Sequence, residues 1–567
     1  MCGPNWMPAR VLLVGQFSNE YIARYCFYSN SYHDMANHLY NLIVEGQAHL
    51  HIPKSVFYNP VQEFNRDLSI IVLKTYLKHD LWRHKRAKNG VRILDALSAS
   101  GLRSIRFAKE LAPHIDVVNK IVANDLSSAA VDLIKNNVAL NKVEDKVSVS
   151  HSDAALLMHM SASPEKCFHV IDLDPFGTAA PFIDPAVSCI DNAGLLMVTC
   201  TDTAVLCGNA SEACFARYGS MSVKADFCHE NALRMVLRSI EARAAVHGKY
   251  IKPLLSISAD FYIRLFVQIF SQQAETKKSA SRVSQLFLCK ECRTHNLNRL
   301  GEYNLKEDPK QASSENAAVK YKFKPPEFSL SNRCEICRGA LTIAGPIWSE
   351  PIHDRQFLGL LKQELNEEQT RKDFATSKRI QGVVYVCSEE LEVPLFHSIK
   401  NMSSILRCPM PPTKDLMSAL YNAGYKSSAT HTNKVGLKTN ASNTVIWDIF
   451  CQYARARNIV VPPNSLAERI MSRSHEQVYD FAYNPKVEVE SQRMSLVRFH
   501  VNPTPEWGPK SRPTGVVKPE ELNDVAGLQL VDVGVDKSTD LQHSGDDEIS
   551  HKKRKFSDSN KLDTDQS

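Results

Sequence analysis

The chain has 567 residues, of which 43% are hydrophobic and 23% charged. This composition excludes a wholly disordered, collagen-like or coiled-coil protein. No run of about 18 apolar residues is present, so we expect no transmembrane helix. At about 150 residues per domain, the length predicts two to four domains. Fifteen cysteines in a chain of this length are too dilute for a disulfide scaffold.

The charge is distributed unevenly along the chain. The formal net charge is +6, but residues 519–567 carry 12 acidic and 6 basic residues, so residues 1–518 carry a net +12. A basic body of this kind favours an anionic partner, above all a nucleic acid.

The predicted elements follow an irregular leader at residues 1–45. Apolar β-branched runs alternate with helical stretches, which predicts strands at 91–95, 121–125, 147–150, 168–173 and 194–199, and helices at 102–111, 127–140 and 226–245. Residues 254–270 predict two further strands. The fold class is therefore α/β, with a Rossmann-like doubly wound sheet covered by helices on both faces.

The rest of the chain divides into two regions. We predict a first domain at residues 46–275, a mixed α/β C-terminal domain at 276–508 and a disordered tail at 509–567. Within the tail, Lys552–Lys555 is a basic quartet typical of nuclear import, or else an accidental charge cluster. The expected location is the nucleus, with the cytoplasm and the mitochondrion left open.

Acidic residues end or follow three successive predicted strands. Small residues after Asp95 (Ser98–Gly101) let a ligand approach the backbone. Because this loop has a single glycine, it does not match the glycine-rich loops that bind a pyrophosphate. Asp125 suits the two hydroxyls of a ribose, and Asp153 with the backbone of Ala154 suits an adenine. Together these features favour S-adenosylmethionine over NAD. The alternative is that each aspartate only caps a helix or lies in a solvated loop.

The fourth strand ends in an Asp-Pro-Phe-Gly sequence that carries the strongest local signal. Asp172 and Asp174 lie near the strand end, followed by Pro175 and Phe176. A carboxylate that accepts hydrogens from an exocyclic base amine directs the lone pair of that nitrogen toward a methyl donor, and Phe176 would stack on the extruded base. The alternative is a buried strand that ends in a proline turn.

Several segments together resemble the tRNA (guanine-26, N2)-dimethyltransferase family. They are Val56–Asp67, Ser98–Ser104, Ala123–Asp125, Ile171–Gly177, Val198–Asp202, Leu255–Tyr262 and Lys434–Asn440. The resemblance implies a class I methyltransferase domain and a C-terminal tRNA-binding domain. It also implies the transfer of one or two methyl groups from S-adenosylmethionine to N2 of guanine 26.

The resemblance also assigns binding residues. Arg66 and Arg103 are similar to cofactor-binding residues, in line with Asp125, Asp153 and Ala154. Without the resemblance, Arg66 would be expected to form an ion pair with Asp67, and Arg103 to lie on a solvated helix face. The partner is expected to be tRNA, bound by basic residues that include Lys438 and His431. Residues 83–88 and 320–324 are further basic candidates.

Two CxxC pairs predict a metal site. Cys289, Cys292, Cys334 and Cys337 suit a closed, tetrahedral, structural Zn²⁺ site. The 41 residues between the pairs exceed the usual spacing of about 15–20, which we attribute to a polar insertion. Redox-active cysteine pairs are the alternative, and the nearby His295 is not expected to be a ligand.

Three other function classes remain open. A base-amine methyltransferase acting on DNA or another RNA would use the same sheet. A nicotinamide dehydrogenase would need a glycine-rich phosphate loop, which Ser98–Gly101 lacks. A non-catalytic RNA-binding module would not depend on Asp174. The sequence indicates neither a membrane partner nor an obligate protein partner.

Overall fold

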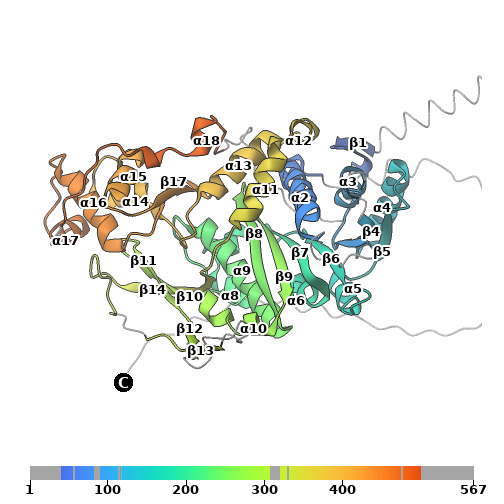
Figure 1. Ribbon diagram of the computed structural model, residues 1–567, viewed down its shortest axis with the longest axis horizontal. Helices are drawn as coiled ribbons and strands as arrows, with labels where there is room; N and C mark the ends of the chain where they lie inside the picture. Colours follow the sequence, from blue (N-terminus) through green and yellow to red (C-terminus); the bar gives the residue numbers. More distant parts are fainter. Residues whose placement is uncertain are drawn as a thin grey trace, which may run out of the picture. The chain divides into compact units, whose positions relative to one another are not determined.

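The computed structural model describes residues 40–54, 58–81, 90–112, 115, 118–306, 320–327, 331–473 and 477–499, all within one structural unit (Figure 1). The leader up to residue 39, the basic segment 83–88 and the tail with Lys552–Lys555 lie outside the described residues. In the described part of the chain, no helix is long and apolar enough to cross a membrane.

A seven-stranded sheet forms the centre of the fold. Its strands are β3 (Val91–Asp95), β4 (Val118–Asp125), β5 (Val147–His151), β6 (Phe168–Leu173), β7 (Ile190–Cys200), β8 (Lys249–Ala259) and β9 (Tyr262–Ser271). The spatial order is β5-β4-β3-β6-β7-β9-β8. The first five strands are parallel neighbours, and β9 runs antiparallel to both β7 and β8. The sheet is thus Rossmann-like with one reversed strand, and the predicted strand pair at 254–270 is β8 and β9.

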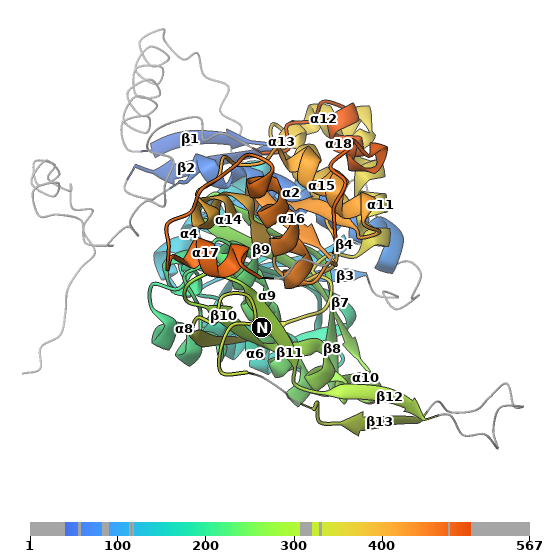
Figure 2. The same cartoon turned by 90° about the vertical axis from the view of Figure 1, so that its left-hand side faces the viewer.

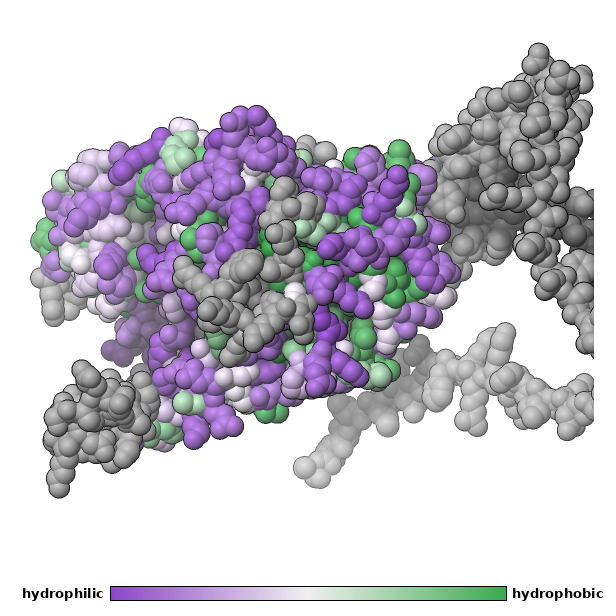
Figure 3. Space-filling view, turned by 45° about the vertical axis from the view of Figure 1, so that its right-hand side comes forward, coloured by the Kyte–Doolittle hydropathy of each residue, from purple (hydrophilic) through white to green (hydrophobic). Residues whose placement is uncertain are grey.

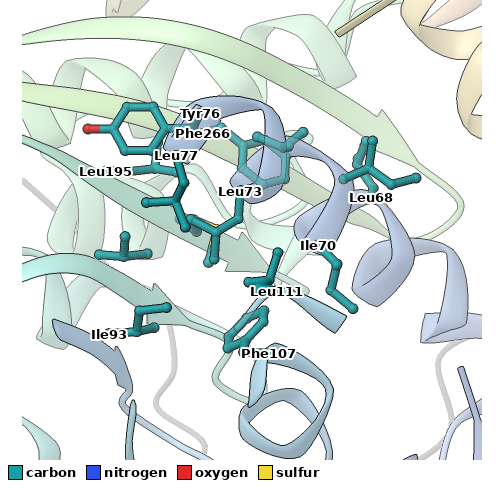
Figure 4. Close-up of a cluster of buried hydrophobic side chains, with 14 of the residues drawn as sticks. Leu68, Ile70, Leu73, Tyr76, Leu77, Ile93, Phe107, Leu111, Leu195 and Phe266 are labelled. Carbon is teal, nitrogen blue, oxygen red and sulfur yellow. The ribbon is translucent and has the colours of Figure 1, made fainter. Parts of the chain in front are cut away.

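Helices cover both faces of this sheet because its strands are apolar on both sides. In β3, Ile93 belongs to one hydrophobic cluster and Leu94 to the other, as the two-residue period of a strand requires. Three helices pack on the Ile93 face: α2 (Glu63–Tyr76), α3 (Leu102–Glu110) and α4 (Ser128–Asn141). Figure 4 shows part of this hydrophobic cluster. The opposite face carries α5 (Ala154–Met160), α6 (Ala180–Cys189), α7 (Thr203–Leu206), α8 (Ser211–Tyr218) and α9 (Cys228–Val246).

The predicted irregular leader at 1–45 is wrong for its last six residues. Strand β1 (Tyr40–Glu45) pairs with β2 (Ala48–Pro53) in an antiparallel hairpin. Only one face of β2 is buried, and Leu42 and Val44 of β1 are exposed, so the apolar signal of the hairpin is weak. Glu45 anchors the hairpin through ion pairs with Arg66 and Arg106.

The C-terminal part contains smaller sheets and a group of helices. Its strands are β10 (Val283–Cys289), β11 (His295–Arg299), β12 (Glu302–Lys306), β13 (Lys320–Lys324), β14 (Leu341–Trp348), β15 (His397–Ser398), β16 (Ser427–Thr430) and β17 (Asn433–Thr439). Its helices are α10 (Gln273–Thr276), α11 (Arg355–Asn366), α12 (Glu368–Asp373), α13 (Ser377–Glu389), α14 (Ile399–Leu406), α15 (Thr413–Asn422), α16 (Asn443–Arg455), α17 (Leu466–Met471) and α18 (Glu490–Arg493). Helices α11 and α13 pack against α2, so this part adjoins the central sheet domain (Figure 1).

Strands β12 and β13 occupy the polar insertion between the two CxxC pairs. They form a separate two-stranded sheet that projects from the body of the structure (Figure 2). Lys322 and Lys324 are exposed on β13. The face of the molecule in Figure 3 is mostly hydrophilic, with smaller hydrophobic areas between the polar side chains.

Candidate active site

The site lies where the strand order of the sheet reverses. β3 has β4 on one side and β6 on the other, and ligands of open α/β sheets bind beyond the carboxyl ends of the strands at such a point. The loop after β3 is bonded to both neighbours, because Ala96 N donates to Asp172 O at 3.1 Å and Ser98 N donates to Asn124 O at 2.8 Å. Gly101, the residue just before α3, has the left-handed conformation, with φ of 79°.

Asp174 lies at this point and is held by Arg103. Both Nε and Nη2 of Arg103 donate to Oδ2 of Asp174, at 2.9 and 2.5 Å. Burial alone would raise the pKa of Asp174, but the charges of Arg103 and Arg264 lower it below its usual value. The carboxylate therefore stays ionised at neutral pH, and it has acceptor capacity beyond the two bonds from Arg103.

A second buried arginine supports this pair. Arg264 of β9 donates through Nη1 to Asp172 Oδ1 at 2.8 Å and to Thr199 Oγ1 at 2.9 Å. Its Nη2 donates to Ser69 Oγ at 2.9 Å. Arg103 Nη1 reaches the same Ser69 oxygen at 3.3 Å. Helix α2 and strands β6, β7 and β9 are thus tied together beneath Asp174.

One sequence-based prediction changes at this network. Asp172 is fully buried and paired with Arg264 and Arg103, so it is a positioning residue and not a group that contacts the substrate. Sequence reasoning missed Arg264, although an arginine within an apolar strand is itself a signal, because buried charges are paired. Arg103 faces Asp174 in this structure, and its predicted contact with the cofactor stays a proposal.

Phe176 and Gly177 form the exposed side of the site. Phe176 is 61% exposed, while the neighbouring Pro175 is buried. Gly177 has a φ of +85°, and a Cβ placed there would meet nothing within 4 Å. Gly177 N donates to Thr201 Oγ1 at 2.7 Å, which joins this turn to the end of β7. The Asp-Pro-Phe-Gly turn therefore presents an aromatic ring next to open space.

The predicted cofactor acids follow β4 and β5, which continue the same edge of the sheet. Asp125 accepts from Ala99 N at 3.0 Å and from Ser127 N at 2.9 Å, so it fixes the loop after β3. Asp153 is exposed and caps α5 by accepting from Leu156 N at 2.9 Å. Ala154 begins that helix and is buried. The structure thus shows a loop-fixing role for Asp125 and a helix-capping role for Asp153, and the predicted cofactor contacts of these residues stay a proposal.

Asp95 lies deeper, at the end of β3. Ser104 Oγ donates to its Oδ2 at 2.8 Å. Burial and the nearby negative charge of Asp172 raise the pKa of Asp95 to about 7, from an ordinary value of 3.8. The native structure therefore favours the protonated form of this carboxyl group over a wider pH range than an ordinary aspartate has.

Arg66 does not form the ion pair with Asp67 that was the alternative to cofactor binding. It binds Glu45 through two bonds, at 2.6 and 2.5 Å, and donates to Asn59 O at 3.1 Å. Asp67 is instead bound by Arg106 at 2.7 Å. The predicted contact between Arg66 and the cofactor stays a proposal.

The structure contradicts the predicted tRNA contacts of Lys438 and His431. Lys438 is 1% exposed and pairs with Glu230 at 2.9 Å and with Glu390 at 2.8 Å. The side chain of His431 is 2% exposed, and its Nδ1 lies 2.7 Å from Glu390 Oε2. Both side chains are committed to buried carboxylates, so neither can contact a phosphate in this conformation.

The four predicted metal ligands converge, although 41 residues separate the two pairs. The sulfurs of Cys289, Cys292, Cys334 and Cys337 all lie within 4.8 Å of one another, and all four residues are buried. Cys289 and Cys337 are 3.4 Å apart, and Cys292 and Cys334 are 3.5 Å apart. Gly339 N donates to Cys337 Sγ at 3.4 Å. Four thiols at these separations fit a tetrahedral Zn²⁺ site.

A second cluster of potential ligands is occupied by internal bonds. His353, Cys387, Glu390 and His431 also lie within 4.8 Å of one another. Glu390 Oε1 already binds Lys438 and Thr430, and Oε2 binds the backbone and the ring of His431. This saturated carboxylate makes the cluster a structural network and not a metal site.

The chain is similar to known tRNA methyltransferases. The family model described as N2,N2-dimethylguanosine tRNA methyltransferase matches residues 40–451. The tRNA (guanine(26)-N(2))-dimethyltransferase of Drosophila melanogaster is 40% identical over 521 residues, which cover 85% of this chain and 88% of that protein. A Saccharomyces cerevisiae relative, with the same name followed by "mitochondrial", is 34% identical and covers 84% of this chain and 92% of its own.

A solved structure is similar as well. Trm1 from Pyrococcus horikoshii, in complex with S-adenosyl-L-methionine, has a TM-score of 0.57 and 26% sequence identity. The match covers 72% of this chain and 98% of that chain.

Proposed function

The chain belongs to the N2,N2-dimethylguanosine tRNA methyltransferase family, and we propose on this basis that it methylates the exocyclic N2 of guanine 26 in tRNA. The methyl donor is S-adenosylmethionine. The observation that carries the proposal is the ionised carboxylate of Asp174, held by Arg103 next to the exposed ring of Phe176.

The chemistry of a base amine explains this arrangement. The lone pair of an exocyclic amine is delocalised into the ring, so the nitrogen is a poor nucleophile. Asp174 would accept a hydrogen of this amine and orient the lone pair, and would then take the proton released on transfer. Phe176 would stack on the extruded guanine and fix its plane. Arg103 and Arg264 keep the carboxylate ionised and in place.

The cofactor side of the site consists of the strand ends next to Asp174. Asp125 would accept from the ribose hydroxyls, and Asp153 and Ala154 would contact the adenine. Arg66 and Arg103 are proposed to bind the methionine carboxylate. Arg103 would then have to bind this carboxylate and that of Asp174 at the same time. When bound, S-adenosylmethionine supplies an electrophilic methyl group. Its transfer to nitrogen is direct and needs no covalent intermediate on the protein.

The Cys289, Cys292, Cys334 and Cys337 cluster is proposed to hold a structural Zn²⁺. The chemistry of the donor set supports this, since four thiolates form a closed site with no position for a substrate. The cluster lies in one hydrophobic core with α14, α15 and α16, so the metal would stabilise the C-terminal part of the chain.

A methyl-transfer assay tests the function. Purified protein, labelled S-adenosylmethionine and unmodified tRNA should yield N2-methylated guanosine, and tRNA with adenine in place of guanine 26 should take up no label. Label that persists on the adenine variant, or that appears equally on DNA, would contradict the assignment.

We also propose nuclear import through Lys552–Lys555, a segment outside the described residues. The name of the yeast relative keeps a mitochondrial location open. Fluorescent fusions of the full chain, with and without alanine at the four basic positions, distinguish the two: loss of nuclear signal in the variant is expected, and unchanged signal would contradict the proposal.

A further inference from the structure

A third group of potential ligands lies outside the site and outside the four-cysteine cluster. Cys207, Cys228 and His229 place a sulfur, a sulfur and a ring nitrogen within 4.8 Å of one another. Cys207 Sγ is 3.7 Å from His229 Nδ1. All three residues are partly exposed, so an ion from solvent has access to them.

The fold brings these residues together from two separate segments. Cys207 directly follows α7, and Cys228 and His229 begin α9. Gly208, with a φ of +97°, brings the first segment against the chain just before Cys228, since a Cβ there would lie 2.4 Å from Lys224 N. Backbone packing therefore fixes the two segments near each other, and the three ligand atoms are brought together without a metal.

The distances suit coordination by one ion. Zn–S bonds of about 2.3 Å and Zn–N bonds of about 2.0 Å place a sulfur and a nitrogen about 3.5 Å apart in a tetrahedral site. The observed separation of 3.7 Å between Cys207 Sγ and His229 Nδ1 is close to this value. In contrast to Glu390 in the saturated cluster, thiol sulfurs are weak hydrogen-bond partners that lose little when a metal binds them.

We propose that Cys207, Cys228 and His229 bind a second zinc-type ion, with water in the fourth position. Two thiolates and an imidazole form a borderline-soft donor set that favours Zn²⁺ over Mg²⁺ or Ca²⁺. On binding, each thiol releases its proton to solvent, and two sulfur–metal bonds and one nitrogen–metal bond form. Three protein ligands at a partly exposed position leave the fourth position open, unlike the closed four-cysteine site.

The metal would act on the segment that borders the active site. Helix α7 follows Thr201, whose backbone N–H donates to Gly177 O at 2.8 Å in the Asp-Pro-Phe-Gly turn. A metal bound to Cys207 and to the start of α9 would hold α7 against α9 and so limit the motion of this segment. Metal binding at these three residues does not depend on the identity of the substrate.

Metal content of the full chain tests the proposal. Protein purified with Zn²⁺ should contain about two equivalents, and Cys207→Ala and His229→Ala should each contain about one. The matched control is Cys167→Ala, which removes a partly buried free cysteine elsewhere and should keep both equivalents. Cys334→Ser removes the other ion, so a failure of the four-cysteine site is seen separately.

Cobalt replacement covers the case in which an alanine variant does not fold. His229→Cys preserves three ligands, so it should keep the ion and shift the Co²⁺ absorption toward that of a site richer in sulfur. Full metal content in Cys207→Ala would overturn the proposal. Purified wild-type protein with a Cys207–Cys228 disulfide, or with metal only at the four-cysteine site, would overturn it as well.

Discussion

The Asp174 carboxylate combines exposure to the site with a fixed orientation, since Arg103 binds one of its oxygens through two bonds. Replacing Asp174 by Asn keeps the shape but removes the negative charge that accepts the amine hydrogen. We expect turnover to fall by about 10²–10⁴-fold, the usual contribution of a positioned acid–base group. Binding of S-adenosylmethionine should change little, because Asp125 and Asp153 are untouched.

Single-turnover methyl transfer and calorimetric cofactor binding measure these two effects separately. The control is Asp132→Asn, which changes an acid on the surface of α4 whose side chain is 71% exposed. Turnover of the Asp174 variant within a few-fold of the wild type would contradict the assigned role.

Asp95 makes stability depend on pH in a predictable direction. Its pKa is raised to about 7 in the native structure by burial and by Asp172, from 3.8. The native state therefore binds this proton more tightly than the unfolded state, so stability should fall as the pH rises from about 4 to about 7. Asp95→Asn should flatten this part of the profile and stabilise the protein at pH 8, by up to about 4 kcal/mol.

Urea unfolding of wild type and Asp95→Asn at a series of pH values measures this contribution. The difference in unfolding free energy between the two should grow as the pH rises from about 4 to about 7 and then level off. A constant difference across this range would show that Asp95 titrates as an ordinary surface carboxylate.

Sequence reasoning at this scale identified residues but not their partners. Asp174 and Phe176 are predicted from their local motif, because a strand end followed by Pro and an aromatic ring is contiguous in the chain. Lys438 was misassigned because its partner Glu230 is 208 positions away, and its sequence neighbours give no sign of burial. A basic residue in a family-like segment looks the same in sequence whether it faces RNA or a buried carboxylate.

At the scale of elements, Lys438 joins β17 of the C-terminal part to α9 of the central sheet domain. Its ammonium group is shared by Glu230 and Glu390, and both carboxylates are buried. Lys438→Met would leave this negative charge without its central cation. Breaking a buried pair costs about 3–5 kcal/mol, so we expect a loss of stability of this size.

Thermal or denaturant unfolding of the full chain measures that loss. Lys434→Met is a matched control on the same strand, because Lys434 is exposed and should change stability by less than about 0.5 kcal/mol. If the Lys438 variant loses tRNA affinity at unchanged stability, the result would support the contact between Lys438 and tRNA that the sequence predicts.

The elements themselves were predictable where both faces of a strand are apolar. Strands β3, β6 and β7 lie in continuous apolar runs because helices cover both faces of the sheet. Hairpin β1–β2 was missed because only one of its faces is buried, so its apolar pattern is short and interrupted. The reversed direction of β9 could not be read either, since alternation along a strand is the same in both orientations.

At the scale of the whole molecule, the four-cysteine cluster joins two segments that a long insertion separates. The two CxxC pairs flank a segment that includes the projecting β12–β13 hairpin, yet their sulfurs meet inside the same core as Trp447 and Leu406. Without a metal, four buried thiols would provide only weak hydrogen bonds there. The proposed Zn²⁺ would therefore close a loop of about 40 residues, and loop closure of this length would stabilise the folded state.

Removal of the metal should accordingly unfold the C-terminal part first. A chelator, or Cys334→Ser, should lower the unfolding temperature and increase hydrogen exchange at α14, α15 and α16, because these helices share the core with the cysteines. Exchange at β3 and β6 should change less, since their core contains none of the four ligands. The control is Cys408→Ser, which alters a buried cysteine of the same core that is not a ligand. Restored protection on addition of Zn²⁺ would establish that the metal, and not the thiols alone, holds this part together; equal loss of protection in β3 and α16 would instead show that the two cores unfold as one.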